Sequence, residues 1–139
     1  MAAEETRTIV RQLMERLDQR DLDSVLSYCT ADARFYGFAP VQLDRAGYKE
    51  MMSALLAAYP DAHFPVDELI VEGEKAVVRH SMRGTHRGTF QGIPPTGKAV
   101  TVSAIVQFRL VGNKVAETWL NADFLGMLQQ LGVVPAAGQ

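Results

Sequence analysis

Three side chains near the C-terminus have types and spacing that suit proton-transfer chemistry. Trp119, Asn121 and Asp123 alternate along a stretch that runs directly into a short helix. Residues two apart in a strand point to the same side of the sheet. A carboxylate held at such a corner could exchange protons. Asn121 could orient that carboxylate or bind a carbonyl group, and Trp119 could wall a ring system.

The hairpin before this stretch predicts that the three side chains face inward. The segment Lys98–Val111 alternates apolar and polar residues, as a half-buried strand does. Gly112 and Asn113 then form a two-residue turn signal, so Val111 should pair with Lys114. The pairs that follow are Val106 with Trp119, Ala104 with Asn121, and Val102 with Asp123.

The expected apolar surroundings make Asp123 the main catalytic candidate. A carboxylate among valine and alanine side chains is costly unless it is paired or used. Desolvation would raise its pKa toward neutrality and make it an effective base. The other interpretation is a helix N-cap, because Phe124–Leu131 has a helical pattern and Gly132 follows it. A capping carboxylate is a poor base, and the residues alone leave both roles open.

Other candidates for a binding pocket lie on earlier strands. His80 and His86 share the parity of Met82, so they could lie on one face. A neutral imidazole there could polarise a carbonyl or shuttle a proton, although His86 could instead cap a strand edge. Tyr36 could supply a pocket hydroxyl or belong to an aromatic core, and Val106 could line the pocket. No His-x-His spacing occurs, so we expect no metal site.

Length, charge and composition limit the classes of protein to which the chain can belong. The chain has 139 residues, which suits a single domain over residues 1–139. Its net charge of −2 gives no electrostatic footprint for nucleic acid, and no apolar run is long enough to span a bilayer. Cys29 is the only cysteine, which is typical of a reducing cytoplasm. We therefore expect a cytoplasmic protein without nucleic-acid or membrane partners.

The elements that position these residues form two groups along the chain. Helical patterns come first, and strands with one last helix follow. The expected elements are helices at Glu4–Gln19, just after Asp21, and at Asp44–Ala58, a short strand at Arg34–Phe38, and strands at His63–Val71, Ala76–Phe90 and Lys98–Val111 before the final strand and helix. This order predicts an α+β fold in which a curved, mostly antiparallel sheet wraps on three N-terminal helices and encloses a conical cavity.

The second half of the chain carries a resemblance to a known family. The run YPDAHFPVDELIVEGEKAVVRHSMRGTHRGTFQGIPPTGKAVTVSAIVQF, followed by ETWLNADFLGMLQQLG, resembles the SnoaL-like polyketide cyclases, within the superfamily that has the nuclear transport factor 2-like, or cystatin-like, cone. The resemblance implies an aldol or ester cyclase that acts on a hydrophobic polyketide-like molecule without a cofactor. It also implies that the acid–base residue is the aspartate at position 123. Ala104 and Val106 depart from the pattern, because some members carry polar residues there.

Two other functions remain open from the sequence. An epoxide hydrolase of the same fold would need a second inward carboxylate near Asp123, and Glu117 shares its parity. A non-catalytic module would bind a small molecule or mediate dimerisation. A homodimer or higher homo-oligomer is expected in any case, because the outer face of such a sheet is broad and better covered.

Overall fold

The computed structural model of the chain describes residues 2–135. Its sheet has the strand order β1-β5-β4-β3-β2, in which β1 runs parallel to β5 and all other neighbours are antiparallel. The strands are β1 Cys29–Tyr36, β2 Val66–Glu72, β3 Lys75–Thr85, β4 Ala99–Val111 and β5 Lys114–Ala122. The helices are α1 Ala2–Asp18, α2 Leu22–Ser27, α3 Arg45–Ala58 and α4 Phe124–Leu131. The expected α+β cone is confirmed.

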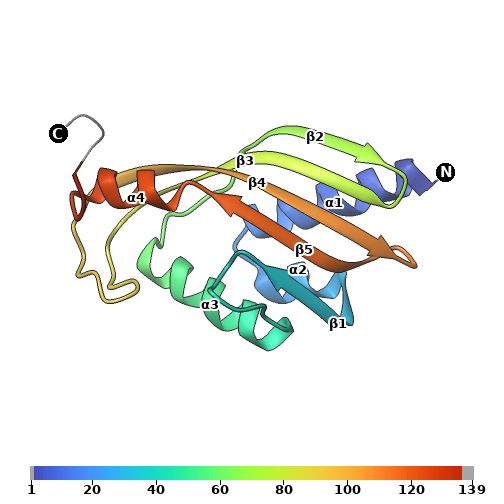
Figure 1. Cartoon of the computed structure of the whole chain (residues 1–139), viewed down its shortest axis with the longest axis horizontal. Helices are drawn as coiled ribbons and strands as arrows, with labels where there is room; N and C mark the ends of the chain where they lie inside the picture. Colours follow the sequence, from blue (N-terminus) through green and yellow to red (C-terminus); the bar gives the residue numbers. More distant parts are fainter. Residues whose placement is uncertain (1, 136–139) are drawn as a thin grey trace.

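The three N-terminal helices cover one face of the curved sheet. In Figure 1, α1 lies behind β3 and β4, and α3 lies below the sheet near β1. The spacing Val10, Leu13, Met14 and Leu17 gives α1 one apolar stripe, and all four side chains are buried. The core therefore lies between these helices and the concave face of the sheet.

Helices α2 and α3 begin where capping aspartates in the sequence indicate. Asp21 caps α2 by accepting a hydrogen bond from the Ser24 amide, and Asp44 caps α3 by accepting one from the Gly47 amide. Each carboxylate satisfies an amide that has no partner within its helix. The cap at Asp44 fixes where α3 begins, and hence which of its side chains face the sheet.

Several strand limits differ from the expectation. Strand β1 begins at Cys29 and not at Arg34, because it pairs in parallel with the distant β5, a contact that local patterns do not reveal. Strand β2 begins only at Val66. Strand β3 ends at Thr85, five residues before Phe90, since the chain turns away there to form the loop that leads to β4.

The hairpin turn is as expected, but the pairing beyond it is not. Gly112 and Asn113 have φ of +56° and +63°, and Val111 pairs with Lys114. An irregularity then places Leu110 opposite Val115 and Arg109 opposite Glu117, so that β5 holds one extra residue, Ala116. Such a bulge reverses the face of every later side chain.

The expected pairs are therefore wrong by one position. Val106 pairs with Leu120 and not Trp119, and Ala104 pairs with Ala122 and not Asn121. Asp123 lies just beyond the end of β5, where its amide still donates a hydrogen bond to the Ser103 carbonyl oxygen of β4 and not to Val102 as the expected register required. The inward side chains of β5 after the bulge are Thr118, Leu120 and Ala122, all of which line the interior.

Candidate functional site

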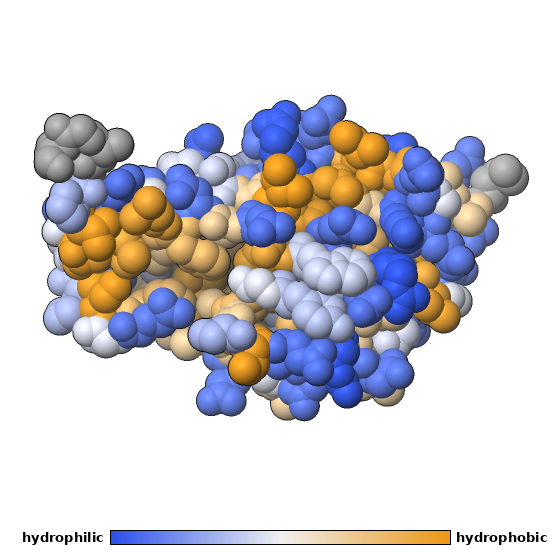
Figure 2. Space-filling model, in the orientation of Figure 1, coloured by the Kyte–Doolittle hydropathy of each residue, from blue (hydrophilic) through white to orange (hydrophobic). Residues whose placement is uncertain are grey.

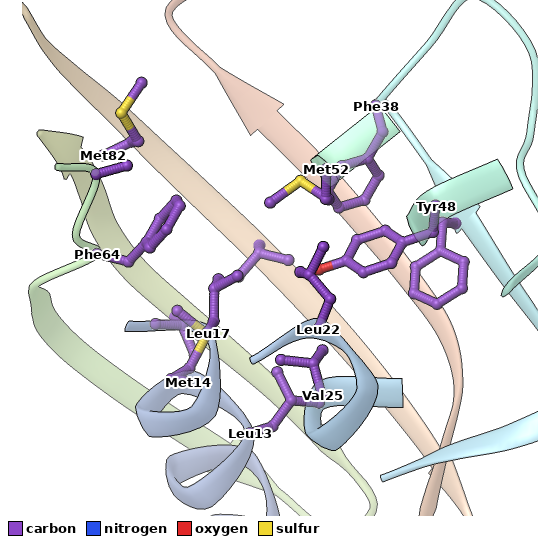
Figure 3. Close-up of a cluster of buried hydrophobic side chains, with 14 of the residues drawn as sticks. Leu13, Met14, Leu17, Leu22, Val25, Phe38, Tyr48, Met52, Phe64 and Met82 are labelled. Carbon is purple, nitrogen blue, oxygen red and sulfur yellow. The ribbon is translucent and has the colours of Figure 1, made fainter. Parts of the chain in front are cut away.

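The helices and the concave face of the sheet enclose an apolar cavity of about 90 Å³. Side chains from all four helices and four of the five strands line it, and β2 contributes none. Five methionines are among them: Met14, Met51, Met52, Met82 and Met127. Because methionine is flexible and polarizable, these walls can adapt to the shape of an apolar ligand. Figure 3 shows part of the cluster, with side chains from the helices pointing toward the strands.

One end of the cavity approaches the surface beside α4. Phe124 lines the cavity and is also 41% exposed, so it lies where the interior meets solvent. Its neighbour Leu125 and the nearby Val133 are exposed as well. Figure 2 shows apolar surface gathered at the α4 end of the molecule. An apolar molecule could enter at this end.

The cavity holds few polar groups, and none of the described residues that line it is an aspartate or glutamate. The polar lining residues are Cys29, Tyr48, His80 and Thr118. Burial raises the pKa of the Cys29 thiol to about 11, so the thiol stays protonated near neutral pH. Burial likewise raises the pKa of the Tyr48 hydroxyl above its usual range. Among the described residues that line the cavity, His80 is therefore the one side chain that can act as a base at neutral pH.

His80 has the features of a neutral buried imidazole. The residue is 6% exposed, and burial lowers the pKa of its imidazole below the usual value near 6.5. Its Nδ1 atom lies 3.4 Å from the Ser81 carbonyl oxygen, which can only accept a hydrogen bond. The proton is therefore assigned to Nδ1, which leaves a lone pair on Nε2. No described residue provides a hydrogen-bond partner for Nε2.

An aromatic cluster fixes Tyr48 on the opposite wall. Its ring stacks on Phe35 at a centroid distance of 4.3 Å and meets Phe38 edge-on at 5.2 Å. Gly37 makes this cluster possible, because its φ is +89° and an added Cβ would collide with the Leu120 carbonyl oxygen. The chain can turn there and place Phe38 against Tyr48.

Asp123 does not lie inside the cavity, so its expected inward placement is wrong. It is exposed, and its Oδ1 accepts a hydrogen bond of 2.8 Å from the Gly126 amide at the start of α4. This is the geometry of a helix N-cap. The physical reason is the bulge at Ala116, together with the end of β5 at Ala122.

Trp119, Asn121 and Tyr36 also lie away from the cavity. Trp119 pairs with Gln107 and Asn121 with Ile105, on the outer face of the sheet. The Tyr36 ring stacks on Trp119 at 5.6 Å. Of the sequence-predicted site residues, only His80 and Val106 line the cavity.

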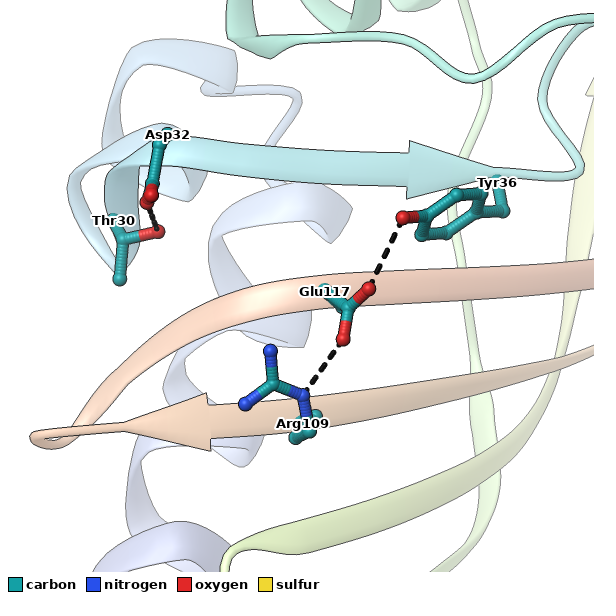
Figure 4. A network of polar contacts seen from close by, with 5 residues as sticks. All are labelled: Thr30, Asp32, Tyr36, Arg109 and Glu117. Atoms are coloured by element: carbon teal, nitrogen blue, oxygen red, sulfur yellow. Dashed lines mark hydrogen bonds and ion pairs between the residues drawn. The ribbon is translucent and has the colours of Figure 1, made fainter.

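Glu117 lies on the same outer face within a polar network. It accepts hydrogen bonds from Arg109 Nε at 2.7 Å and from the Tyr36 hydroxyl at 3.0 Å (Figure 4). These bonds, that from Arg109 first, lower the pKa of the Glu117 carboxyl. The second inward carboxylate that an epoxide hydrolase would need is therefore absent from the described cavity lining.

His86 forms a separate buried cluster behind the end of α3. Its Nδ1 accepts a hydrogen bond of 3.2 Å from the Thr96 amide, and its ring stacks on Tyr59. The Nε2 of His86 and the Tyr59 hydroxyl are both buried without a hydrogen-bond partner among residues 2–135. Neither residue lines the cavity, so His86 holds the loop before β4 rather than facing the interior.

Thr118 lines the cavity but was missed from the sequence as a site candidate, because the one-residue shift in register hid its inward position. The sequence did carry a signal for the shift. Val115 and Leu120 are five residues apart, and a regular strand cannot place both inward.

No group of three or more His, Cys, Asp or Glu residues within the described chain could hold a metal ion. Over residues 2–135, no helix has both the length and the apolar character needed to cross a membrane.

Comparison with known proteins identifies related structures. AclR of Streptomyces galilaeus, a proposed hydroxylase, is 25% identical with a TM-score of 0.88, over 96% of this chain and 99% of that one. TsrD of Streptomyces laurentii is 29% identical with a TM-score of 0.80, over 92% and 98%. A proposed polyketide cyclase of Acidithiobacillus ferrooxidans is 27% identical with a TM-score of 0.78, over 93% and 95%.

A search of curated proteins finds no match. The profile of the SnoaL-like polyketide cyclases, in contrast, matches residues 7–131, which is most of the sequence. The chain therefore belongs to the SnoaL-like polyketide cyclase family.

Proposed function

We propose that the protein is a cyclase that acts on an apolar, carbonyl-containing small molecule inside the cavity, with His80 and not Asp123 as the base. The observation that carries the proposal is the unpartnered Nε2 of a neutral imidazole in an otherwise apolar enclosure. A proposed polyketide cyclase among the related structures supports the substrate class.

The chemistry needs only a base and a way to hold the substrate. A C–H bond next to a carbonyl is acidic, because the electron pair left behind is delocalised onto the carbonyl oxygen. His80 Nε2 takes that proton and becomes an imidazolium. The enolate carbon then attacks a second carbonyl of the same molecule, and the imidazolium returns its proton to the new alkoxide. The enclosure contributes by holding the two reacting carbons together.

Deuterium exchange into 2-tetralone tests this role directly. The two protons on C1 of this bicyclic ketone lie next to both the ring and the carbonyl, so a base removes them and D₂O returns deuterons. We expect the protein to accelerate the loss of the C1 proton NMR signal. His80→Gln removes the base but keeps a polar side chain, and should lower the acceleration by at least about 100-fold, the scale of general base catalysis.

His63 supplies the matched control for that experiment. It is an exposed histidine, so His63→Gln removes an imidazole without touching the cavity. That variant should exchange deuterium at the wild-type rate. Equal exchange by the His80→Gln variant, with its fold intact by circular dichroism, would contradict the assignment of the base.

A carrier function is the second candidate, and the apolar lining favours it. A cavity of about 90 Å³ without a lining carboxylate could store an apolar molecule unchanged. The same experiment separates the two functions. A carrier would bind 2-tetralone, seen as line broadening of the ketone signals, without accelerating the exchange at C1.

We also propose that the outer face of the sheet joins two copies of the chain. The adjacent residues Ile70, Val77, Gln107 and Trp119 form a row across four strands. Ile70 and Ile105 are 56% and 48% exposed, and Figure 2 shows apolar surface over this part of the sheet. Sedimentation equilibrium should give a dimer for the wild type and a monomer for Ile105→Lys. A monomeric wild type at high concentration would contradict the proposal.

A further inference from the structure

We propose that Thr118 and Tyr48 form a hydrogen-bonding subsite within the cavity that binds an oxygen atom of the ligand far from His80. The inference rests on the proposed function in one respect, because it takes the cavity as the ligand site. It adds a requirement on the substrate: an acceptor oxygen at the end remote from the reacting carbon.

The first observation is the state of the Thr118 hydroxyl. Thr118 is 3% exposed and lines the cavity, and its Oγ1 has no hydrogen-bond partner among residues 2–135. A buried hydroxyl without a partner is costly, and most such groups in folded proteins are satisfied. Valine has nearly the same shape and would avoid that cost. A ligand oxygen would supply the missing partner.

The second observation is that Tyr48 and Thr118 share a neighbour. Phe35 pairs with Thr118 across the β1–β5 ladder, and the Tyr48 ring stacks on Phe35. Both Thr118 and Tyr48 line the cavity on this side of Phe35's strand. No described residue bonds to the Tyr48 hydroxyl. Figure 3 shows it pointing toward the middle of the buried cluster, away from the α3 backbone.

The pairing of the strands places Thr118 far from His80 along the sheet. His80 pairs with Ala104, and Ala104 pairs with Ala122. Thr118 precedes Ala122 by four residues, so it lies two strands across and four residues along from His80. On a flat sheet this gives roughly 16 Å between their Cα atoms. The walls between the two ends are apolar.

This arrangement defines a ligand class. Both hydroxyls are neutral and can donate, so they suit an uncharged acceptor such as a ketone or quinone oxygen. The ligand would carry its reacting carbon near His80, an apolar ring system in the middle and the oxygen at the far end. A hydrocarbon of the same shape would leave both hydroxyls without a partner.

A pair of probes that differ in one oxygen tests the subsite. 2-Acetylnaphthalene carries a ketone at one tip of its ring system, and 2-ethylnaphthalene has the same carbon skeleton without the oxygen. We expect the wild type to bind the ketone more tightly, with affinities measured by titration calorimetry. Thr118→Val and Tyr48→Phe should each reduce the ketone-to-hydrocarbon affinity ratio by about fivefold, the usual effect of one hydrogen bond.

Two controls make the result specific. Thr118→Ser restores the hydroxyl and should keep much of the wild-type ratio. Tyr59→Phe removes a hydroxyl that is equally buried and unpartnered but lies outside the cavity, and should leave the ratio unchanged. Thr118→Val should melt at or above the wild-type temperature, because it removes an unpartnered group.

The outcomes separate this inference from the proposed function. If the wild type, Thr118→Val and Tyr48→Phe bind both probes with the same ketone-to-hydrocarbon affinity ratio, the subsite is overturned and the cavity remains the ligand site. Failure of the wild type to bind either probe would overturn the cavity as a ligand site and the subsite with it. A lower ratio in Tyr59→Phe would show that the effect is not local, and would also overturn the subsite.

Discussion

Substitution of Asp123 separates the role of helix cap from that of a base. Its Oδ1 accepts a hydrogen bond of 2.8 Å from the Gly126 amide, where α4 begins. Replacing an N-cap aspartate with alanine typically costs about 1 kcal/mol. For a chain of this size, that change lowers the melting temperature by about 3 °C. We therefore expect this decrease in Asp123→Ala, and a smaller one in Asp123→Asn, whose amide oxygen can still accept the bond.

The assay pairs thermal unfolding with deuterium exchange into 2-tetralone. Because Asp123 is exposed and faces no cavity group, both variants should exchange at a rate close to that of the wild type. Asp44→Ala is the matched stability control, since Asp44 caps α3 through the Gly47 amide at the same 2.8 Å distance. Loss of exchange in Asp123→Asn, with an unchanged melting temperature, would refute the reasoning and restore Asp123 as the base.

Three further predictions follow from buried groups and one glycine. Burial lowers the pKa of His80, so its neutral form contributes stability above about pH 6.5 that is lost as pH falls toward the lowered pKa. The rate of deuterium exchange into 2-tetralone should accordingly fall on the acid side only below pH 6.5. A fall that begins above pH 6.5 would contradict the assignment of His80 as the base. Burial raises the pKa of Cys29 to about 11, so DTNB should label this thiol only after unfolding, and rapid labelling of the native protein at pH 8 would be inconsistent with the structure. Gly37→Ala should destabilise the protein by more than about 1 kcal/mol in urea unfolding, since it strains a positive φ and collides with Leu120; a neutral effect would mean that the turn is wrongly placed.

Much of the fold could be predicted because its signals are local. The apolar stripe of α1, the capping aspartates and the Gly112-Asn113 turn each depend on residues a few positions apart. The start of β1 could not be predicted in this way. It pairs with a strand that lies about eighty residues later, and nothing near Cys29 in the sequence reports that partner.

The candidate site was harder to predict because it depends on strand parity. One extra residue at Ala116 turns Trp119, Asn121 and Asp123 outward and brings Thr118 inward. The register counted from the Gly112-Asn113 turn predicted an inward Trp119, but Trp119 lies on the outer face, where stacking on Tyr36 gives it an apolar contact. The sequence placed His80 on the same face as Met82 by its parity, and both line the cavity because β3 has no irregularity along its pairing with β4.

A crystal structure of the protein with 2-tetralone would test the central claim most directly. The proposal predicts the ketone inside the cavity, with its C1 atom facing His80 Nε2 and no contact to Asp123. Electron density for 2-tetralone on the outer face or beside the Asp123 carboxylate, with an empty cavity, would contradict it.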